Sequence, residues 1–320
     1  HIHCETVPKI KEVENESAEQ SIINVSKGVG MEESGVIVSS AFSKCFNISK
    51  LYTFQYKSLI EGLLRDRNYC IILTARTAGG KTLSFLLPIL IKILDWKLKG
   101  QMKRGVKSML FYPTKPLCYD QADTILKLIW YINKEIGDIK NIITLGILHG
   151  DIYDREQLAR LWEYGYNELD IRLKCPECGR RLKVRIRKIE DFYNWAIEEI
   201  LCTNDKCPIR RNRNLHDLLN KTLKITRDAI YSDPPDILIT NPDTINVRLI
   251  YEPKSQSIFG RKLKYCPICG YTTIAMNRTK CKRCRHELES LSDISYPQII
   301  VVDEAHWLRG AFGAQVSYVI

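Results

Sequence analysis

Apolar runs alternate with helix-like patterns along most of the chain from about residue 49 onward. Predominantly apolar runs, each expected to form a strand, cover 70–75, 108–114, 141–148, 236–240 and 298–303. Apolar residues with helical spacing fill 55–65, 81–96 and 117–134. Strands that are apolar on both faces are typical of a parallel sheet covered by helices on each side. The alternation therefore predicts an α/β fold with a doubly wound sheet.

Three segments depart from this rhythm. Residues 1–48 are polar and mixed in charge, so we expect a linker or the edge of an upstream segment. The intervals at about 166–232 and 254–292 each contain four paired cysteines. We expect them to be insertions in a core domain that spans 49–320.

The segment TARTAGGKT at 74–82 follows the first expected strand and precedes a helix. This is the setting of a phosphate-binding loop, whose glycines let the backbone approach the phosphates. Lys81 would place its charge on the β- and γ-phosphates, and Thr82 would offer its hydroxyl to Mg²⁺. Ala75 replaces the usual first glycine but keeps its amide; the alternative is a Gly-rich turn before a helix. The expected ATP-binding residues of the loop are Thr77, Ala78, Gly79, Gly80, Lys81 and Thr82.

The segment VVDEAHW at 301–307 places two carboxylates directly after the last apolar run. Hydrolysis of a phosphoanhydride needs one carboxylate near Mg²⁺ and another group that orients the attacking water. Asp303 fits the first role and Glu304 the second, while His306 would link the nucleotide state to bound nucleic acid. Without the phosphate loop upstream, a solvated pair of loop carboxylates would be the ordinary interpretation.

Charge and cysteine content add two expectations. The chain has 48 Lys and Arg against 37 Asp and Glu, a net charge of +11, which favours an anionic partner such as nucleic acid. A basic protein without such a partner is the alternative. Eight of the 12 cysteines form four close pairs, a pattern typical of metal binding. Neither a membrane-spanning run nor a signal peptide is recognisable, so the expected location is cytoplasmic.

Two sets of four cysteines have the spacing of zinc knuckles. They are Cys175, Cys178, Cys202 and Cys207, and Cys266, Cys269, Cys281 and Cys284. Four thiolates around one tetrahedral Zn²⁺ leave no position for a substrate, so we expect two structural Zn²⁺ sites in zinc-ribbon-like modules. Disulfides, an iron–sulfur cluster and reduced thiols are the alternatives.

The segment RRLKVRIRK at 180–188 alternates apolar and basic residues. As a strand it has one apolar face and one basic face. The basic face is either the solvated side of a zinc ribbon or a surface that follows phosphates.

Taken together, these segments resemble the motifs of superfamily 2 helicases of the DEAH kind. The matching segments are LYTFQ (51–55), TARTAGGKT (74–82, motif I), YPTKPLCYDQ (112–121, motif Ia), LHGD (148–151), ILITNPDTI (237–245, motif Ib) and VVDEAH (301–306, motif II). The closer resemblance is to DNA helicases related to the mitomycin-repair helicase (YprA-like), which share Thr-Ala-x-Gly-Lys in motif I. Arg76 and Pro116 depart from the family pattern. The resemblance implies a RecA-like P-loop NTPase domain with a parallel sheet.

The same resemblance implies an ATP-dependent helicase that hydrolyses ATP, with ATP and Mg²⁺ as cofactors and a role in DNA repair or processing. Gln55 would read adenine. The expected nucleic-acid-binding residues are Thr114, Lys115, Thr240, Asn241 and Asp243. Since motifs III to VI are not recognisable, we expect the second RecA-like domain to be absent from these 320 residues and to belong to the same parent chain. The 320 residues alone would then bind ATP weakly and barely hydrolyse it.

The expected partner is therefore nucleic acid, with DNA favoured by the closer resemblance, and no membrane. Two alternatives stay open. One is an RNA helicase or remodeller, because motifs I and II do not distinguish DNA from RNA. The other is a non-catalytic, zinc-bearing nucleic-acid-binding module that keeps an ATPase-like lobe as a scaffold.

Overall fold

The structure, a computed structural model, describes residues 2–4, 11–65, 69–73, 80–101, 103–138, 140–188, 196–291 and 294–307. The chain divides into two compact units. Unit 1 comprises 1–102 and 128–143, and unit 2 comprises 103–127 and 144–320. Helix α5 (Lys115–Ile136) contributes its first half to unit 2 and the remainder to unit 1.

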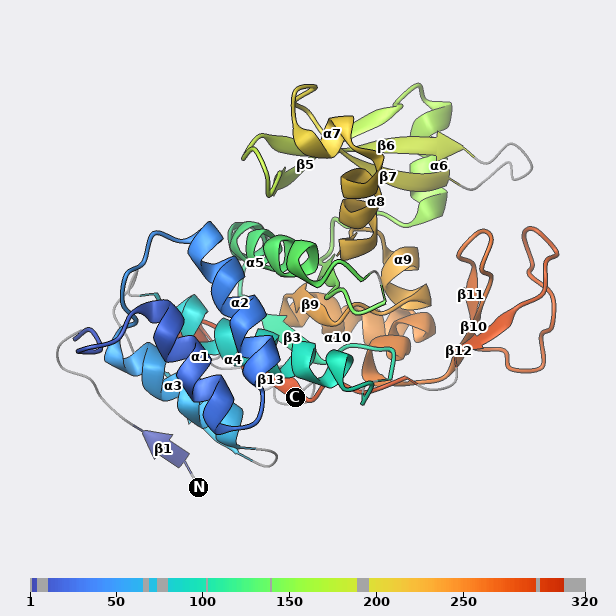
Figure 1. Ribbon diagram of the computed structural model, residues 1–320. Helices are drawn as coiled ribbons and strands as arrows, with labels where there is room; N and C mark the ends of the chain where they lie inside the picture. The colour runs from blue at the N-terminus through green and yellow to red at the C-terminus, as the bar shows by residue number, and fades with distance from the viewer. Residues whose placement is uncertain are drawn as a thin grey trace. The chain divides into compact units, whose positions relative to one another are not determined.

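Unit 1 is largely helical (Figure 1). Its helices are α1 (Ala18–Gly28), α2 (Glu32–Cys45), α3 (Thr53–Leu64) and α4 (Lys81–Leu98). The linker expected over 1–48 is thus replaced in part by two helices, α1 and α2, that pack on each other. Ile22, Val38 and Phe42 are fully buried, and they give these otherwise polar segments enough apolar surface to pack.

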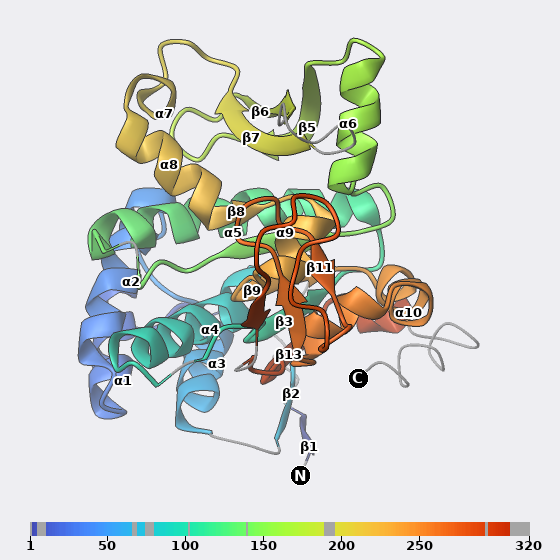
Figure 2. The ribbon, with the colours of Figure 1, turned by 90° about the vertical axis from the view of Figure 1, so that its right-hand side faces the viewer.

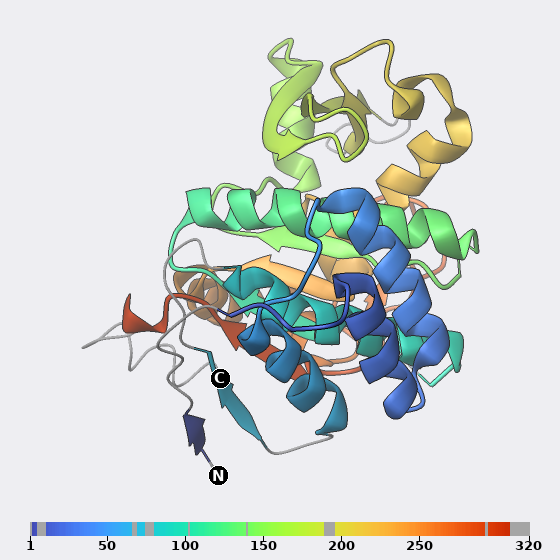
Figure 3. The ribbon, with the colours of Figure 1, turned by 60° about the vertical axis from the view of Figure 1, so that its left-hand side comes forward.

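The strand that precedes the phosphate loop differs from its prediction. Strand β2 (Cys70–Ile72) pairs in parallel with β1 (Ile2–Cys4) near the N-terminus (Figure 3), and neither belongs to the five-stranded sheet. Cys70 is exposed and Ile72 is 42% exposed. Within the described ranges β2 has a partner on one edge only, which explains why its apolar side chains are less covered than those of a central strand.

Unit 2 contains the predicted parallel sheet. Its strands are β3 (Ser108–Phe111), β4 (Leu145–Leu148), β8 (Leu223–Lys224), β9 (Ile237–Thr240) and β13 (Ile299–Val302), in the order β13-β3-β9-β4-β8. All pairs are parallel, and β3, β4 and β9 are buried throughout. Phe111 lies in register with both Val302 and Thr240, so the carboxyl ends of these strands are level.

The first insertion is an antiparallel sheet of β5 (Glu168–Lys174), β6 (Arg181–Lys188) and β7 (Ala196–Cys202). Helix α6 (Arg155–Glu163) packs on it, and α7 (Pro208–Arg211) and α8 (Arg213–Thr222) follow it. The chain returns to the parallel sheet at β8 and continues into α9 (Arg227–Ser232). The insertion therefore ends about ten residues earlier than the expected 232, because a two-residue strand leaves no recognisable pattern.

The second insertion is a smaller antiparallel sheet, with β10 (Leu263–Tyr265) between β11 (Thr272–Thr273) and β12 (Glu289–Leu291) (Figure 2). Helix α10 (Pro242–Tyr251) and the 3-10 turn η1 (Pro253–Phe259) precede it, and the short turn η2 (Ala305–Trp307) follows β13. The structure confirms an α/β fold with a parallel sheet and two cysteine-bearing modules. None of the described helices is long and apolar enough to cross a bilayer.

Candidate functional site

Gln55 lies at the start of α3 and contacts the end of the phosphate loop. Its Oε1 accepts a hydrogen bond from Tyr52 N at 2.9 Å, and its Nε2 donates to Gly80 O at 3.0 Å. The side chain is only 2% exposed. Gln55, predicted to read adenine, is therefore held against the backbone that carries Lys81.

Gly80 forms the junction between the loop and α4. Its φ of +77° lies in the left-handed region, and an added Cβ would lie 2.6 Å from Gln55 Nε2. Glycine suits both requirements because it lacks a Cβ. Lys81 and Thr82 form the first turn of the 18-residue helix α4, where backbone N–H groups and the helix dipole favour an anion. The remaining predicted ATP-binding residues, Thr77, Ala78 and Gly79, lie outside the described residues.

In unit 2 the predicted catalytic carboxylates follow β13 directly. Asp303 N donates to Phe111 O at 3.0 Å, which fixes the aspartate at the end of the sheet. Glu304 N donates to Asp303 Oδ1 at 2.9 Å, and Glu304 adopts a φ of +52°, a strained backbone for a residue other than glycine. His306 Nδ1 lies 3.1 Å from Glu304 Oε2. The pair therefore has the tight turn after a strand that its predicted role requires.

The residues predicted to contact nucleic acid divide into exposed and buried groups. Thr114 and Asp243 are exposed, and the side chain of Lys115 is 42% exposed. Thr240 is fully buried, and its hydroxyl donates to Leu148 O at 2.7 Å, so this side chain joins β9 to β4. Asn241 is 7% exposed, and its Oδ1 has no hydrogen-bond partner among the described residues.

Lys115 is held by the loop after β4. Its Nζ lies 2.6 Å from Asp151 Oδ1, and this hydrogen bond holds the pKa of the Asp151 carboxyl below its usual value. His149 in the same loop is 1% exposed, and its ring contacts Tyr119 edge-on with centroids 4.9 Å apart. Burial lowers the pKa of His149 to about 4. The sequence singled out the LHGD segment but not the burial of its histidine.

Both predicted sets of cysteines converge. Within each set the sulfur atoms lie within 4.8 Å of one another. Individual Sγ–Sγ distances are 3.6 Å for Cys175–Cys207, 3.4 Å for Cys178–Cys202, 3.2 Å for Cys266–Cys284 and 3.6 Å for Cys269–Cys281. A tetrahedral ion with Zn–S bonds of about 2.3 Å places its sulfurs about 3.8 Å apart, whereas a disulfide needs about 2.05 Å. Each set can therefore hold one tetrahedral metal ion.

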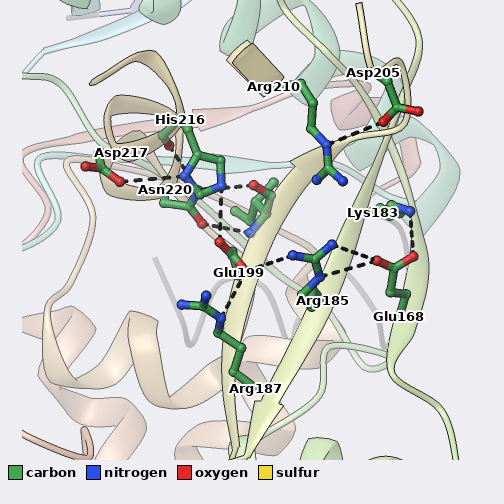
Figure 4. Close-up of polar contacts among 11 residues, drawn as sticks. Glu168, Lys183, Arg185, Arg187, Glu199, Asp205, Arg210, His216, Asp217 and Asn220 are labelled. Carbon is green, nitrogen blue, oxygen red and sulfur yellow. Dashed lines mark hydrogen bonds and ion pairs between the residues drawn. The ribbon is translucent and has the colours of Figure 1, made fainter. Parts of the chain in front are cut away.

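The basic face of β6 is paired with carboxylates on the neighbouring strands (Figure 4). Lys183 and Arg185 lie 2.5 Å and 3.4 Å from Glu168. Arg187 lies 3.2 Å from Glu199. These ion pairs favour the interpretation of the strand as the solvated face of a ribbon, because a surface that follows phosphates needs uncompensated charge.

Comparisons with known proteins agree with the motifs. Residues 53–177 match the family of DEAD/DEAH box helicases. The chain is 24% identical to DISARM protein DrmA of Bacillus paralicheniformis over 289 residues, which cover 79% of this chain and 25% of that protein. It is 30% identical to ATP-dependent RNA helicase DBP9 of Saccharomyces cerevisiae over 100 residues, 29% of this chain and 17% of the relative. It is 32% identical to the mitochondrial ATP-dependent RNA helicase MSS116 of Candida glabrata over 96 residues, 30% of this chain and 14% of the relative.

The chain spans about a quarter of the length of DrmA and a smaller share of the RNA helicases. The family match over 53–177 includes motifs I and Ia, and the match with DrmA covers most of the present chain. Residues 53–177 therefore form a domain of the DEAD/DEAH box helicase type, and the motif order and the parallel sheet agree with the N-terminal lobe of superfamily 2 helicases.

Proposed function

We propose that the chain is the ATP-binding lobe of an ATP-dependent DNA helicase or translocase that acts in DNA repair or processing. The observation that carries this proposal is the strand-end turn at Asp303 and Glu304, together with a helix that begins at Gly80-Lys81-Thr82. Lys81 binds the β- and γ-phosphates, Thr82 and Asp303 hold Mg²⁺, and Glu304 orients the attacking water. These are the components that phosphoryl transfer to water requires.

Gln55 contributes to adenine recognition in this proposal. An amide nitrogen carries two hydrogens, and the bond to Gly80 O uses one of them. The other is the donor that would recognise the adenine ring. Because Gln55 contacts the loop backbone, a bound base would also stabilise the loop that carries Lys81.

Nucleic acid would contact the carboxyl end of the sheet in unit 2. The exposed Thr114 and the half-exposed Lys115 lie at the start of α5, and the exposed Asp243 lies in the first turn of α10. A phosphate would compete with Asp151 for Lys115. Contacts to phosphate carry no base information, so we expect binding with little sequence preference.

DNA is the proposed nucleic acid because motif I resembles that of the mitomycin-repair helicases. The second candidate is RNA, which is favoured by the names of the relatives DBP9 and MSS116. The proposed domain organisation is a core lobe over 49–320 with two zinc modules, and a second RecA-like domain supplied by the same parent protein, in the cytoplasm. The sulfur geometry supports one structural Zn²⁺ in each module.

The test is ATP hydrolysis by the protein encoded by the complete reading frame, alone and with single-stranded DNA or RNA. Lys81→Ala is the control. Stimulation by DNA that is lost in the control is the expected result. Stimulation by RNA alone would identify RNA as the substrate. If no ATP is hydrolysed under any condition, the lobe is a scaffold and the non-catalytic alternative is favoured.

A further inference from the structure

Strand β5 attaches the first cysteine module to the helix that carries motif Ia. Lys174 N, in the last residue of β5, donates to Asp123 Oδ1 on α5 at 2.7 Å, and Lys174 Nζ lies 3.7 Å from Asp123 Oδ2. The side chain of Asp123 is 16% exposed. Both residues belong to unit 2, so this module lies directly against the first half of α5.

The pairing of β5 with β6 is irregular just before this contact. Asp170 pairs with Lys183, and Lys174 pairs with Arg181. Between these two pairs the chain advances four residues along β5 but only two along β6. Arg172 lies in the middle of this bulge and is exposed. A bulge changes the direction of the side chains that it contains.

The charge of Arg172 acts on the loop after β4 and on α5. It contributes to the electrostatics of His149, Tyr119 and Asp151. The pKa of the Asp151 carboxyl is lowered chiefly by the Lys115 hydrogen bond, and Arg172 makes the smallest contribution. Across the described ranges no salt bridge or hydrogen bond uses the Arg172 guanidinium. On β6, by contrast, Lys183, Arg185 and Arg187 are paired with carboxylates.

We propose that Arg172, contributed by the first cysteine module, binds a backbone phosphate of the same nucleic-acid strand that Lys115 contacts. Lys115 is already paired with Asp151, whereas the exposed guanidinium of Arg172 has no such partner within the described residues and can meet a phosphate directly. A guanidinium matches two phosphate oxygens at once. The module thus extends the strand-binding surface of the lobe. This inference rests on the proposed nucleic-acid-binding function.

The test measures binding of a fluorescently labelled single-stranded oligonucleotide, DNA or RNA, to the full-length protein by anisotropy at several KCl concentrations. The variants are Arg172→Ala, Arg172→Lys and Lys115→Ala. Arg213→Ala is the matched control, because Arg213 belongs to the same module and its side chain is 92% exposed.

We expect Arg172→Ala to weaken binding about three- to tenfold and to reduce the slope of log K against log salt by about 0.7, the value for one phosphate on a single strand. Arg172→Lys should keep most of the slope, and Arg213→Ala should change neither quantity. Wild-type affinity and slope in Arg172→Ala, with both reduced in Lys115→Ala, would overturn this inference and leave the proposed function intact. A wild-type protein that binds neither DNA nor RNA would overturn both.

Discussion

Gln55 Nε2 donates a hydrogen bond to the carbonyl oxygen of Gly80 at 3.0 Å and thereby joins the start of α3 to the end of the phosphate loop. The two residues are 25 positions apart in the chain. Gly80 has a left-handed backbone and leaves no room for a Cβ beside this amide. Gly80 therefore provides both the left-handed backbone at the end of the loop and the space that the Gln55 side chain occupies.

Gly80→Ala should disturb both functions. An alanine in the left-handed region costs about 1–2 kcal/mol, and its Cβ would also meet Gln55 Nε2. We expect a loss of thermal stability and at least about tenfold weaker ATP binding, which corresponds to about 1.4 kcal/mol. Thermal unfolding and titration with a fluorescent ATP analogue measure the two effects.

Gly100→Ala is the matched control for this change. Gly100 also has a positive φ, +64°, but nothing lies within 4 Å of an added Cβ. It should show the loss of stability from backbone strain without weaker ATP binding. Equal ATP affinities for the two variants would contradict the role assigned to the contact between Gln55 and Gly80.

Arg155 connects the two cysteine modules. Its Nε lies 2.9 Å from Glu198 Oε2 on β7, and its Nη1 donates to Cys269 O of the second module at 3.2 Å. The side chains of Arg155 and Glu198 are 13% and 9% exposed. Gly270 has a φ of +70°, and a Cβ there would collide with Arg155 Nη1.

Removal of one partner from a buried ion pair leaves the other charge uncompensated. Arg155→Ala should therefore lower the free energy of unfolding by about 3 kcal/mol, in the range measured for broken buried pairs. Arg160→Ala, an exposed arginine on the same helix α6, should change it by less than about 0.5 kcal/mol. Chemical denaturation provides the measurement, and equal stabilities would show that Arg155 is dispensable for the modules.

The sequence predicted the core of unit 2 because β3, β4 and β9 are short apolar runs that are buried on both faces. It also predicted both sets of cysteines, since knuckle spacing places thiolates together locally. It missed the helices α1 and α2, whose few buried residues are hidden among serines and glutamates. It missed β8 because a two-residue strand is too short to show a hydrophobic period.

Contacts between segments that lie far apart in the sequence could not be predicted from residue patterns. The ion pairs that neutralise β6 depend on the register of β5 and β7, and Glu168 and Glu199 have no pattern that assigns them to Lys183 or Arg187. The contact of Arg155 with Cys269 O likewise joins residues 114 positions apart. The sequence therefore left the role of the basic strand open, and the ion pairs of the folded module favour the solvated-face interpretation.

Metal removal tests the two Cys₄ sites. We expect about two Zn²⁺ per chain by elemental analysis, one for each cluster. Cys269→Ser should lower the content to about one, whereas Cys70→Ser, an exposed thiol outside both clusters, should leave it unchanged. A chelator should lower the unfolding temperature because the metal contributes folding energy. Iron in place of zinc, or no metal, would contradict the assignment.

Acid should destabilise unit 2 through His149. Burial lowers the pKa of His149 to about 4 in the folded state, below the usual value of 6.5. Between pH 6.5 and 4 the unfolded chain therefore binds a proton that the folded chain does not, and stability falls as the pH falls through this window. The full difference in the free energy of unfolding is about 3 kcal/mol.

His149→Phe should flatten the pH dependence of the free energy of unfolding in this window, while His286→Phe, at an exposed histidine, should keep the wild-type curve. A His149→Phe protein with the wild-type pH dependence would show that His149 is not the group that titrates.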